Sequence, residues 1–471
     1  MDCDKRFSSG HLILKPEELR LSDLVRLILS GDVEKPRLVD SSDTTEPRFR
    51  RRILIFVSVV VLKILLLVSA PLSLFGSASE FVLNFLSHNT FSDVFLRGEV
   101  VIPEKSSPGY VSFVGYLDTR ISLDTTARRE DGHRFYAALC IMASKFAYEN
   151  PARIKYVVED YWKMKFLGMD NYWNEYLEKN TTQAFMMSDE SSDGEETIVV
   201  SFRGTEPFNS EDWCSDFDIT WYELPDIGRI HGGFMKALGL HKNYGWPKDP
   251  LPNPNRKSPL AYYAIRDKLK TLTCHNQRTR FVLTGHSLGG ALAILFVAVL
   301  IMDGEVTLLD KIRGVYTYGQ PRVGDSRFAA FMEKRLEEHD ITYYRFVYNN
   351  DIVPRLPFDD KDLMFKHFGT CVFYDRRYDA KVLREEPNKN FFCPAAMVRM
   401  TSSAAMELVR SFTIAAREGP EFEEGWLQRV ARVFGLFLPG ISNHSPQDYV
   451  NAIRLGPSHV FRVHRNLRIS N

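Results

Sequence analysis

Residues 285–289 (GHSLG) place Ser287 between two glycines, at the junction of two apolar stretches. The preceding stretch, 280–284, has the composition of a buried strand, and the following one, 288–302, that of a buried helix. A strand, the pattern G-x-S-x-G and a helix form the nucleophile elbow of an α/β-hydrolase. The glycines relieve crowding in the turn, and the helix N-terminus faces the negative charge that develops during ester cleavage. The alternative is a glycine-rich turn without chemistry.

A serine nucleophile needs a base and a carboxylate, and in this fold both follow the serine in the order acid, then histidine. Asp351 comes directly after a predicted strand, 342–348. The loops at the carboxyl ends of parallel strands build such sites, so we expect Asp351 to be the acid. Asp359 and Asp360 read as a solvated pair in a charged loop. The alternative for Asp351 is a turn-forming aspartate that caps the next element.

Three histidines near the C-terminus are candidates for the base. His444 stands in a loop before a helix-like segment, 445–455, whereas His459 and His464 lie in a basic, strand-like tail. A surface position suits the tail histidines better. We therefore expect His444 to be the base, and spacing alone leaves the other two open.

Ester hydrolysis also needs backbone N–H groups that bind the oxyanion. One should come from Leu288, the residue after the nucleophile. The second should come from the loop after the strand predicted at 196–202, where Gly204 allows a turn and the Thr205 hydroxyl offers a further donor. The alternative is an ordinary glycine turn at a strand end.

Composition excludes several classes of function. The 471 residues carry 60 basic and 60 acidic side chains, so nothing points to a nucleic-acid partner. The six cysteines are scattered, without C-x-x-C pairs, and the polar first ten residues do not predict a signal peptide. We expect reduced thiols facing the cytosol, with no metal ion and no organic cofactor.

The chain divides into a polar N-terminal region (1–47), a lipid-anchoring region (48–96) and a globular domain (97–471). Within the first, residues 15–31 predict a short amphipathic helix. The globular domain alternates predicted strands with predicted helices. That alternation predicts an α/β-hydrolase fold, in which helices cover both faces of a mostly parallel sheet.

The anchoring region opens with an arginine cluster at 48–52, followed by an apolar run, 53–75. As a helix this run reaches about 34 Å, enough to cross a bilayer core. Lys63 near its middle would cost about 2.5 to 3.5 kcal/mol in a bilayer, and Pro71 should kink or end the helix. These residues favour entry into an apolar phase from one side, with the arginines at an anionic cytosolic surface. Residues 81–95 are a second interfacial candidate, and a buried core helix is the alternative.

Five motifs occur in order: FRGT at 202–205, HGGF at 231–234, GHSLGG at 285–290, YGQPRVGD at 318–325 and NDIVPRLP at 350–357. Together they resemble the class 3 (fungal-type) triacylglycerol lipase family. The resemblance implies that Ser287 is the nucleophile and Asp351 the acid, with Thr205 and Leu288 in the oxyanion hole. His444 is similar to the family's base, although the family has aspartate where Asn443 stands and a tyrosine closer than Tyr449.

The family resemblance also implies a lid over the site, here about residues 206–225, with Phe208, Trp213, Phe217 and Trp221 among acidic residues. A fixed, partly buried loop is the alternative. The N-terminal apolar run and a long insertion, about 359–440, resemble the plant oil-body lipases. Within the insertion, residues 426–438 place apolar side chains on one helical face, which suits an interface or a domain core equally.

These features predict a serine carboxylester hydrolase that releases fatty acids from triacylglycerol and other acylglycerols. The expected place is a cytosol-facing lipid-droplet monolayer or the endoplasmic reticulum membrane. A phospholipase A1 or galactolipase is the alternative within enzymes. A catalytically idle lipase-like scaffold is the alternative from another class.

Overall fold

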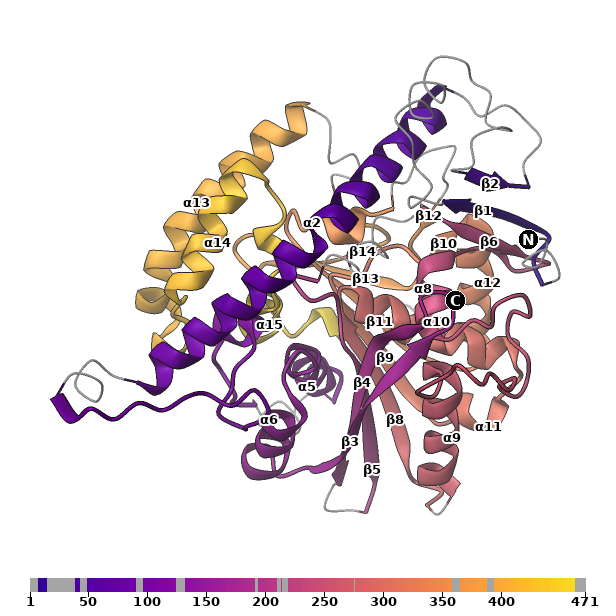
Figure 1. The fold of residues 1–471 in the computed structure, drawn as a ribbon, viewed down its shortest axis with the longest axis horizontal. Helices are drawn as coiled ribbons and strands as arrows, with labels where there is room; N and C mark the ends of the chain where they lie inside the picture. The colour runs from indigo at the N-terminus through magenta and orange to yellow at the C-terminus, as the bar shows by residue number, and fades with distance from the viewer. Residues whose placement is uncertain are drawn as a thin grey trace.

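The computed structural model describes residues 7–14, 39–42, 49–89, 96–123, 132–190, 194–209, 213, 219–274, 276–357, 365–387 and 394–461 (Figure 1). Its centre is an eight-stranded sheet in the order β14-β13-β11-β9-β8-β5-β4-β3. The strands are β3 (Lys165–Asn174), β4 (Lys179–Glu190), β5 (Glu196–Phe202), β8 (Arg280–His286), β9 (Ile312–Tyr318), β11 (Tyr343–Tyr348), β13 (Thr370–Tyr374) and β14 (Ala380–Leu383).

The five central strands, from β5 to β13, run parallel to one another, and the strands at both edges are antiparallel. The register places Phe202 opposite Gly285, and His286 opposite Tyr318. Because the strands are parallel and in this register, the loops that follow β5, β8, β9 and β11 leave the sheet at the same edge.

Side chains alternate between the two faces of the sheet. On β5, Ile198 and Val200 join one buried cluster, whereas Val199 joins the other. The first cluster packs under α8 (Gly232–Leu238), α9 (Ala261–Cys274), α10 (Leu288–Met302) and α12 (Ser326–Glu338). The second packs under α5 (Gly132–Phe146) and α15 (Pro446–Leu455). The predicted α/β-hydrolase fold, a mostly parallel sheet covered on both faces, is confirmed.

A second, six-stranded sheet joins the N-terminal region to the globular domain, in the order β12-β10-β7-β6-β1-β2. Its strands are β1 (Gly10–Leu14), β2 (Val39–Ser41), β6 (Trp221–Leu224), β7 (Gly228–His231), β10 (Gly324–Asp325) and β12 (Phe365–Lys366). In β1, His11 pairs with Tyr222 of β6. The described strands of this region, β1 and β2, are therefore part of a sheet of the globular domain, because β1 pairs with β6 about two hundred residues along the chain. The helix predicted at 15–31 lies outside the described residues.

The apolar N-terminal run belongs to one long helix, α2 (Phe49–His88), of 40 residues and about 60 Å. The helix does not end at Pro71, which lies inside it. It also takes in the start of the apolar stretch at 81–95, so two predicted segments form one element. A proline inside a helix removes one hydrogen bond and costs about 3 kcal/mol. Residues of α2 on both sides of Pro71 contact the globular domain.

The helix α2 runs lengthwise along the globular domain (Figure 1), and side chains at three points along it contact other elements. Ile55, Val59 and Leu62 are buried in a cluster with Leu12, Trp221 and Phe365. Further along, Gly76 lies so close to Phe208 that a Cβ added at Gly76 would lie 2.5 Å from the Cβ of Phe208. Near the end, the buried Asn84 side chain accepts from Val111 N (2.9 Å) and donates to Val111 O (2.8 Å).

Residues Ile55–His88 are long and apolar enough to cross a membrane, with a mean hydropathy of 2.6 and 17% of the most apolar window buried. Large apolar residues exposed on α2 are Ile53, Val57, Ile64, Leu67, Val68, Leu74, Phe75, Phe81, Val82 and Leu86.

The insertion predicted at 359–440 has two structural parts. Its first half extends the central sheet with β13 and β14. Its second half is a pair of packed helices, α13 (Pro394–Glu418) and α14 (Trp426–Phe437), here called the helical hairpin. The remaining short elements are α3 (Phe113–Leu117), α6 (Pro151–Tyr156), η4 (Val157–Tyr161), α11 (Val306–Leu309), η5 (Val353–Arg355), η6 (Pro420–Phe422) and η7 (Ser442–His444).

Docking of α2 predicts different effects from two leucines on the same helix. Leu62→Ala should lower the free energy of unfolding by about 2 to 5 kcal/mol, because Leu62 is 2% exposed and its removal leaves a cavity. Leu67→Ala is the matched control, since Leu67 is 71% exposed and should change stability by less than about 0.5 kcal/mol. Denaturant unfolding of both full-length variants in one non-ionic detergent measures this. Equal losses would contradict the docked helix.

Candidate active site

Three predicted residues from distant parts of the chain form one hydrogen-bonded chain. Ser287 Oγ lies 2.7 Å from His444 Nε2. On the other side of the ring, His444 Nδ1 lies 2.8 Å from Asp351 Oδ2 and 3.0 Å from Oδ1. Nδ1–H donates to the carboxylate, so Nε2 of the neutral ring is the acceptor that faces the serine hydroxyl. This arrangement suits a serine activated by a neighbouring base.

Backbone geometry at Ser287 is that of a sharp elbow, with φ 59° and ψ −132° between β8 and α10. A Cβ at Gly285 would meet the carbonyl carbon of Gly289 at 2.1 Å, and one at Gly289 would meet Phe202 O at 2.2 Å. Only hydrogen fits at either position, because β5, β8 and α10 approach one another there. The two glycines flanking the serine are therefore a packing requirement of the turn.

The Asp351 carboxylate is fully buried and accepts three hydrogen bonds. Besides the His444 ring, it accepts from Val353 N (2.9 Å) and from the Tyr449 hydroxyl (2.5 Å). Burial, together with the Asp351 charge, raises the pKa of Tyr449 well above its ordinary value, so Tyr449 stays a neutral donor. Sequence reasoning missed this contact, although it singled out Tyr449 for its distance from His444.

A second histidine, His286, lies beside the first. Its ring centroid is 4.4 Å from that of His444, its Nε2 is 2.9 Å from His444 O, and its Nδ1 is 2.9 Å from Tyr148 OH. Burial, and next the proximity of His444, lower the pKa of His286 well below its ordinary value. A neutral His286 therefore braces the backbone of His444 without adding a charge. This contact was not predicted; His286 is the variable residue of the elbow motif.

The predicted oxyanion donors lie at the same edge of the sheet. Leu288 is the first residue of α10, so its N–H has no partner within the helix. Thr205 follows the end of β5, next to the elbow, and is 5% exposed. A Cβ at Gly204 would meet His286 O at 2.4 Å, so the loop that carries Thr205 packs directly on the elbow.

Of the two alternative histidines, the described one, His459, does not join this group. His459 is exposed in a turn after α15, and His464 lies outside the described residues, as do Asp359 and Asp360. The described start of the tail differs from the predicted strand, because Val460 and Phe461 are helical and buried. Their apolar side chains pack on the sheet cluster beside α15.

The lid predicted at 206–225 is only partly described. Its last residues form β6, where Trp221 is 2% exposed and belongs to the core under α2. At its start, the centroid of the Phe208 ring lies 5.6 Å from that of Phe75 of α2 and 4.7 Å from that of Phe113. Phe217 lies outside the described residues. A cavity of about 750 Å³ lies beside this segment, lined by residues that include Ser73, Tyr148, Arg203 and Phe208.

A buried ion cluster supports the loop that carries Asp351. Arg322 donates to Arg355 O (2.8 Å), and its other nitrogen lies 3.2 Å from Glu386 Oε1. Arg355 in turn donates to the main-chain oxygen of Asp351. Burial alone would raise the pKa of Glu386, but His367, Arg345 and Arg322 outweigh burial and hold that pKa at about 2.

Comparison with known proteins places these residues in a family. A family model described as Lipase (class 3) matches residues 199–361. The triacylglycerol lipase OBL1 of Nicotiana tabacum is 40% identical, over 86% of this chain and 83% of the relative. The protein of the same name from Arabidopsis thaliana is 38% identical, over 97% of this chain and 96% of the relative. A lipase of Rhizopus niveus is 30% identical over 38% of this chain and 40% of its own length.

The Glu386 cluster predicts how stability depends on pH. A carboxylate whose pKa falls on folding stabilises the protein above its unfolded pKa of about 4.3, and this contribution is lost as pH falls towards 2. Glu386→Gln should therefore cost about 3 kcal/mol of unfolding free energy at pH 7, and the deficit should shrink between pH 4.5 and 2. Denaturant unfolding across this range measures it. Glu338→Gln, which removes a partly exposed ion pair with Arg335, is the control. A loss of unfolding free energy in Glu386→Gln that does not change with pH would contradict the role given to the Glu386 charge.

Proposed function

The chain belongs to the class 3 lipase family, and from this membership we propose that it is a serine carboxylester hydrolase that releases fatty acids from triacylglycerol. The observation that carries the proposal is the hydrogen-bonded chain Ser287–His444–Asp351. The names of its relatives from Nicotiana tabacum and Arabidopsis thaliana, both triacylglycerol lipases, support the substrate class.

In the proposed reaction, His444 Nε2 takes the proton of Ser287 Oγ as that oxygen attacks the ester carbonyl. The negative charge on the tetrahedral intermediate is stabilised by the Leu288 N–H and by Thr205. His444 then gives its proton to the departing glyceride oxygen, which leaves an acyl-enzyme. Water enters, His444 takes one of its protons, and the fatty acid leaves as Ser287 regains a hydrogen. Asp351 orients the ring and stabilises its charged form throughout.

The proposed site of action is the surface of a lipid droplet, approached from one side. Because α2 is docked along its length, crossing a bilayer would require it to leave the domain and expose Ile55, Val59 and Leu62. Lying flat, it presents its other apolar side to a monolayer and keeps these three residues buried. A droplet has no second aqueous side, so a helix that enters one surface suits it.

The helical hairpin offers a second apolar surface. On α14 and at its C-cap, Leu438, the exposed large side chains are Trp426, Val430, Val433, Phe434, Phe437 and Leu438. Aromatic and aliphatic side chains at helical spacing on one face are typical of interfacial helices. We assign this face, together with the outer face of α2, to contact with the acylglycerol phase.

The lid expected at about residues 206–225 remains a proposal for the part that precedes β6. Ser287 is only 2% exposed, so a bulky ester reaches it only when covering residues move. Phe208 packs against Phe75 of α2, which links the start of this segment to the lipid-facing helix. Contact with lipid at α2 would then favour an open position of the segment.

Replacing the nucleophile tests the chemistry. Ser287→Ala should reduce hydrolysis of emulsified triacylglycerol by at least about 10³-fold while folding and droplet binding remain, because only the attacking oxygen is removed. Fatty-acid release is measured side by side on triacylglycerol, phospholipid and galactolipid. Retained activity in the variant would overturn the mechanism. If the wild-type enzyme prefers phospholipid or galactolipid, that lipid replaces triacylglycerol as the proposed substrate. If the wild-type enzyme hydrolyses none of the three lipids and is not labelled by a phosphonate, the protein is an idle scaffold.

Point substitutions test the surface better than deletion of α2, because deletion would expose the core around Trp221. We expect two double variants to float with triacylglycerol droplets several-fold less than the wild type, since charges resist transfer into oil. The variants are Leu67→Asp/Leu74→Asp on α2 and Phe434→Asp/Phe437→Asp on α14. Hydrolysis of a soluble short-chain ester should stay within twofold.

The matched control for the surface test is Val306→Asp/Tyr244→Asp, at two exposed apolar residues on other elements. Flotation of this control should equal that of the wild type. Unchanged flotation in both test variants would move the lipid contact elsewhere on the molecule.

A further inference from the structure

One carboxylate on the helical hairpin joins the two loops that carry Asp351 and His444. Glu407 of α13 is 1% exposed. Its Oε1 accepts from Asn349 Nδ2 (2.9 Å), two residues before Asp351. Its Oε2 accepts from Asn443 Nδ2 (2.7 Å), the residue before His444. A single side chain from a helix outside the sheet therefore binds both loops at once.

Further contacts limit how Glu407 can move. Tyr348, the last residue of β11, donates to Glu407 Oε1 at 2.8 Å. Arg432 of α14 places Nη1 3.8 Å from Oε2. The Glu407 carboxylate thus lies between the end of a core strand and a buried guanidinium. Each of its two oxygens accepts a hydrogen bond from a different loop.

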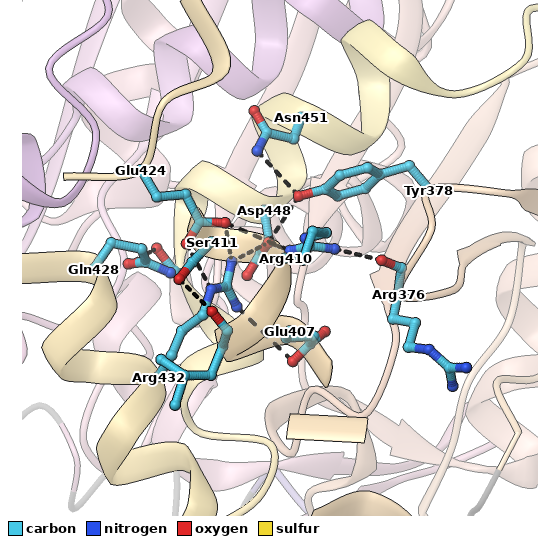
Figure 2. Close-up of polar contacts among 12 residues, drawn as sticks. Arg376, Tyr378, Glu407, Arg410, Ser411, Glu424, Gln428, Arg432, Asp448 and Asn451 are labelled. Atoms are coloured by element: carbon cyan, nitrogen blue, oxygen red, sulfur yellow. Dashed lines mark hydrogen bonds and ion pairs between the residues drawn. The ribbon is translucent and has the colours of Figure 1, made fainter. Parts of the chain in front are cut away.

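The charges behind Glu407 form a compact buried cluster (Figure 2). Arg432, fully buried, makes a fork with Glu424 (2.6 and 2.7 Å) and reaches Asp448 Oδ1 at 2.9 Å. Arg410 binds the same Asp448 oxygen at 3.1 Å and the Tyr348 hydroxyl at 2.8 Å. Because these arginines are held by other carboxylates, they can stand beside Glu407 without drawing it away from the loops.

The hairpin also holds the turn around His444 from a second side. Ser445, directly after His444, donates to Gln428 Oε1 of α14 at 3.1 Å. Gly435 of α14 lies so close to Ser442 that a Cβ there would meet its hydroxyl at 2.3 Å. The two neighbours of His444 in the chain are therefore held by the hairpin, Asn443 by α13 and Ser445 by α14.

Burying this many charges is an expensive way to stabilise a hairpin. Ion pairs in a protein interior often contribute less stability than apolar side chains of the same volume, and each charge left without a partner costs several kcal/mol. Their better-attested use is to specify one arrangement of the surrounding groups. Here the groups that Glu407 specifies are the two loops of the acid and the base.

We propose that Glu407 is a positioning residue, which sets the distance and angle between the His444 ring and the Asp351 carboxylate through Asn443 and Asn349. The proposal rests on the proposed function, in which His444 is the base for Ser287. It also explains why an asparagine stands at position 443. An asparagine amide can donate to Glu407, whereas an aspartate would place a second carboxylate against it.

Reversing the direction of one hydrogen bond tests the proposal. Glu407→Gln leaves one acceptor oxygen for the two asparagine donors, so its new amide NH2 must face the donor of either Asn443 or Asn349. Asn443→Asp turns an acceptor towards the Glu407 acceptor. Each should lower kcat for a soluble nitrophenyl butyrate by about 10²-fold with KM within threefold, because small displacements of catalytic groups have costs of this size. In the double variant Glu407→Gln/Asn443→Asp, the new amide on α13 donates to the new carboxylate beside His444, and kcat should recover at least tenfold over either single variant.

Glu175→Gln is the matched control. Glu175 is also buried and accepts hydrogen bonds from Lys242 N, Asn253 Nδ2 and Arg256, and His241 Nδ1 lies 3.3 Å from its Oε2. It lies outside the hairpin and the two loops. Its kcat should remain within twofold of the wild type. The rate at which a phosphonate labels Ser287 should follow kcat in all five proteins, since labelling needs the same base.

Two results would overturn the positioning role: a wild-type kcat in Glu407→Gln, or losses that simply multiply in the double variant. If Glu407→Gln does not fold, Asn443→Ala replaces it, because this change removes only the donor; a wild-type kcat there would also refute the proposal. Retained hydrolysis in Ser287→Ala would instead refute the proposed function. An inactive Ser287→Ala beside a fully active Glu407→Gln refutes the positioning role alone.

Discussion

The close approach of α10 to the ends of β5 and β8 is the constraint on which the rest of the structure depends. It leaves room for nothing larger than hydrogen at Gly285 and Gly289, and it forces Ser287 into a left-handed backbone conformation. Strain of this kind persists only where the surroundings over-determine it. Here a buried parallel sheet on one side and an apolar helix on the other supply that rigidity. The serine hydroxyl consequently leaves the sheet in a single direction, and other groups must come to it.

Those other groups come from loops that buried charge holds in place. Glu386 and its arginines lie beneath the loop of Asp351, and Glu407 with Arg432 lies beside the loop of His444. Charges are costly inside a protein, so each cluster persists only as a nearly complete set of partners. Loops held by such sets resist small displacements, which apolar packing alone permits more readily. The helical hairpin thus has two distinct sides, one ionic and facing the loops, the other apolar and exposed.

The long helix α2 shows a similar division. Residues at helical spacing, such as Ile55, Val59 and Leu62, complete the core of the second sheet. The opposite side remains apolar and uncovered by the described part of the chain, which is unusual for a helix in water. One helix therefore contributes both to the core and to the exposed apolar surface. Its start packs beside β6, and its middle packs beside Phe208.

Local pattern was sufficient for much of this protein. Short apolar stretches rich in β-branched and aromatic residues predicted β5, β8 and β11, and a longer apolar stretch predicted α10, because each element's pattern lies within its own segment. The glycines around Ser287 likewise predicted the elbow. Tertiary structure alone decided which histidine lies beside Ser287, that β1 pairs with β6, that α2 continues through Pro71, and that Glu407 bridges two loops. These outcomes depend on contacts between residues far apart in the chain, and no short segment of sequence encodes its distant partner.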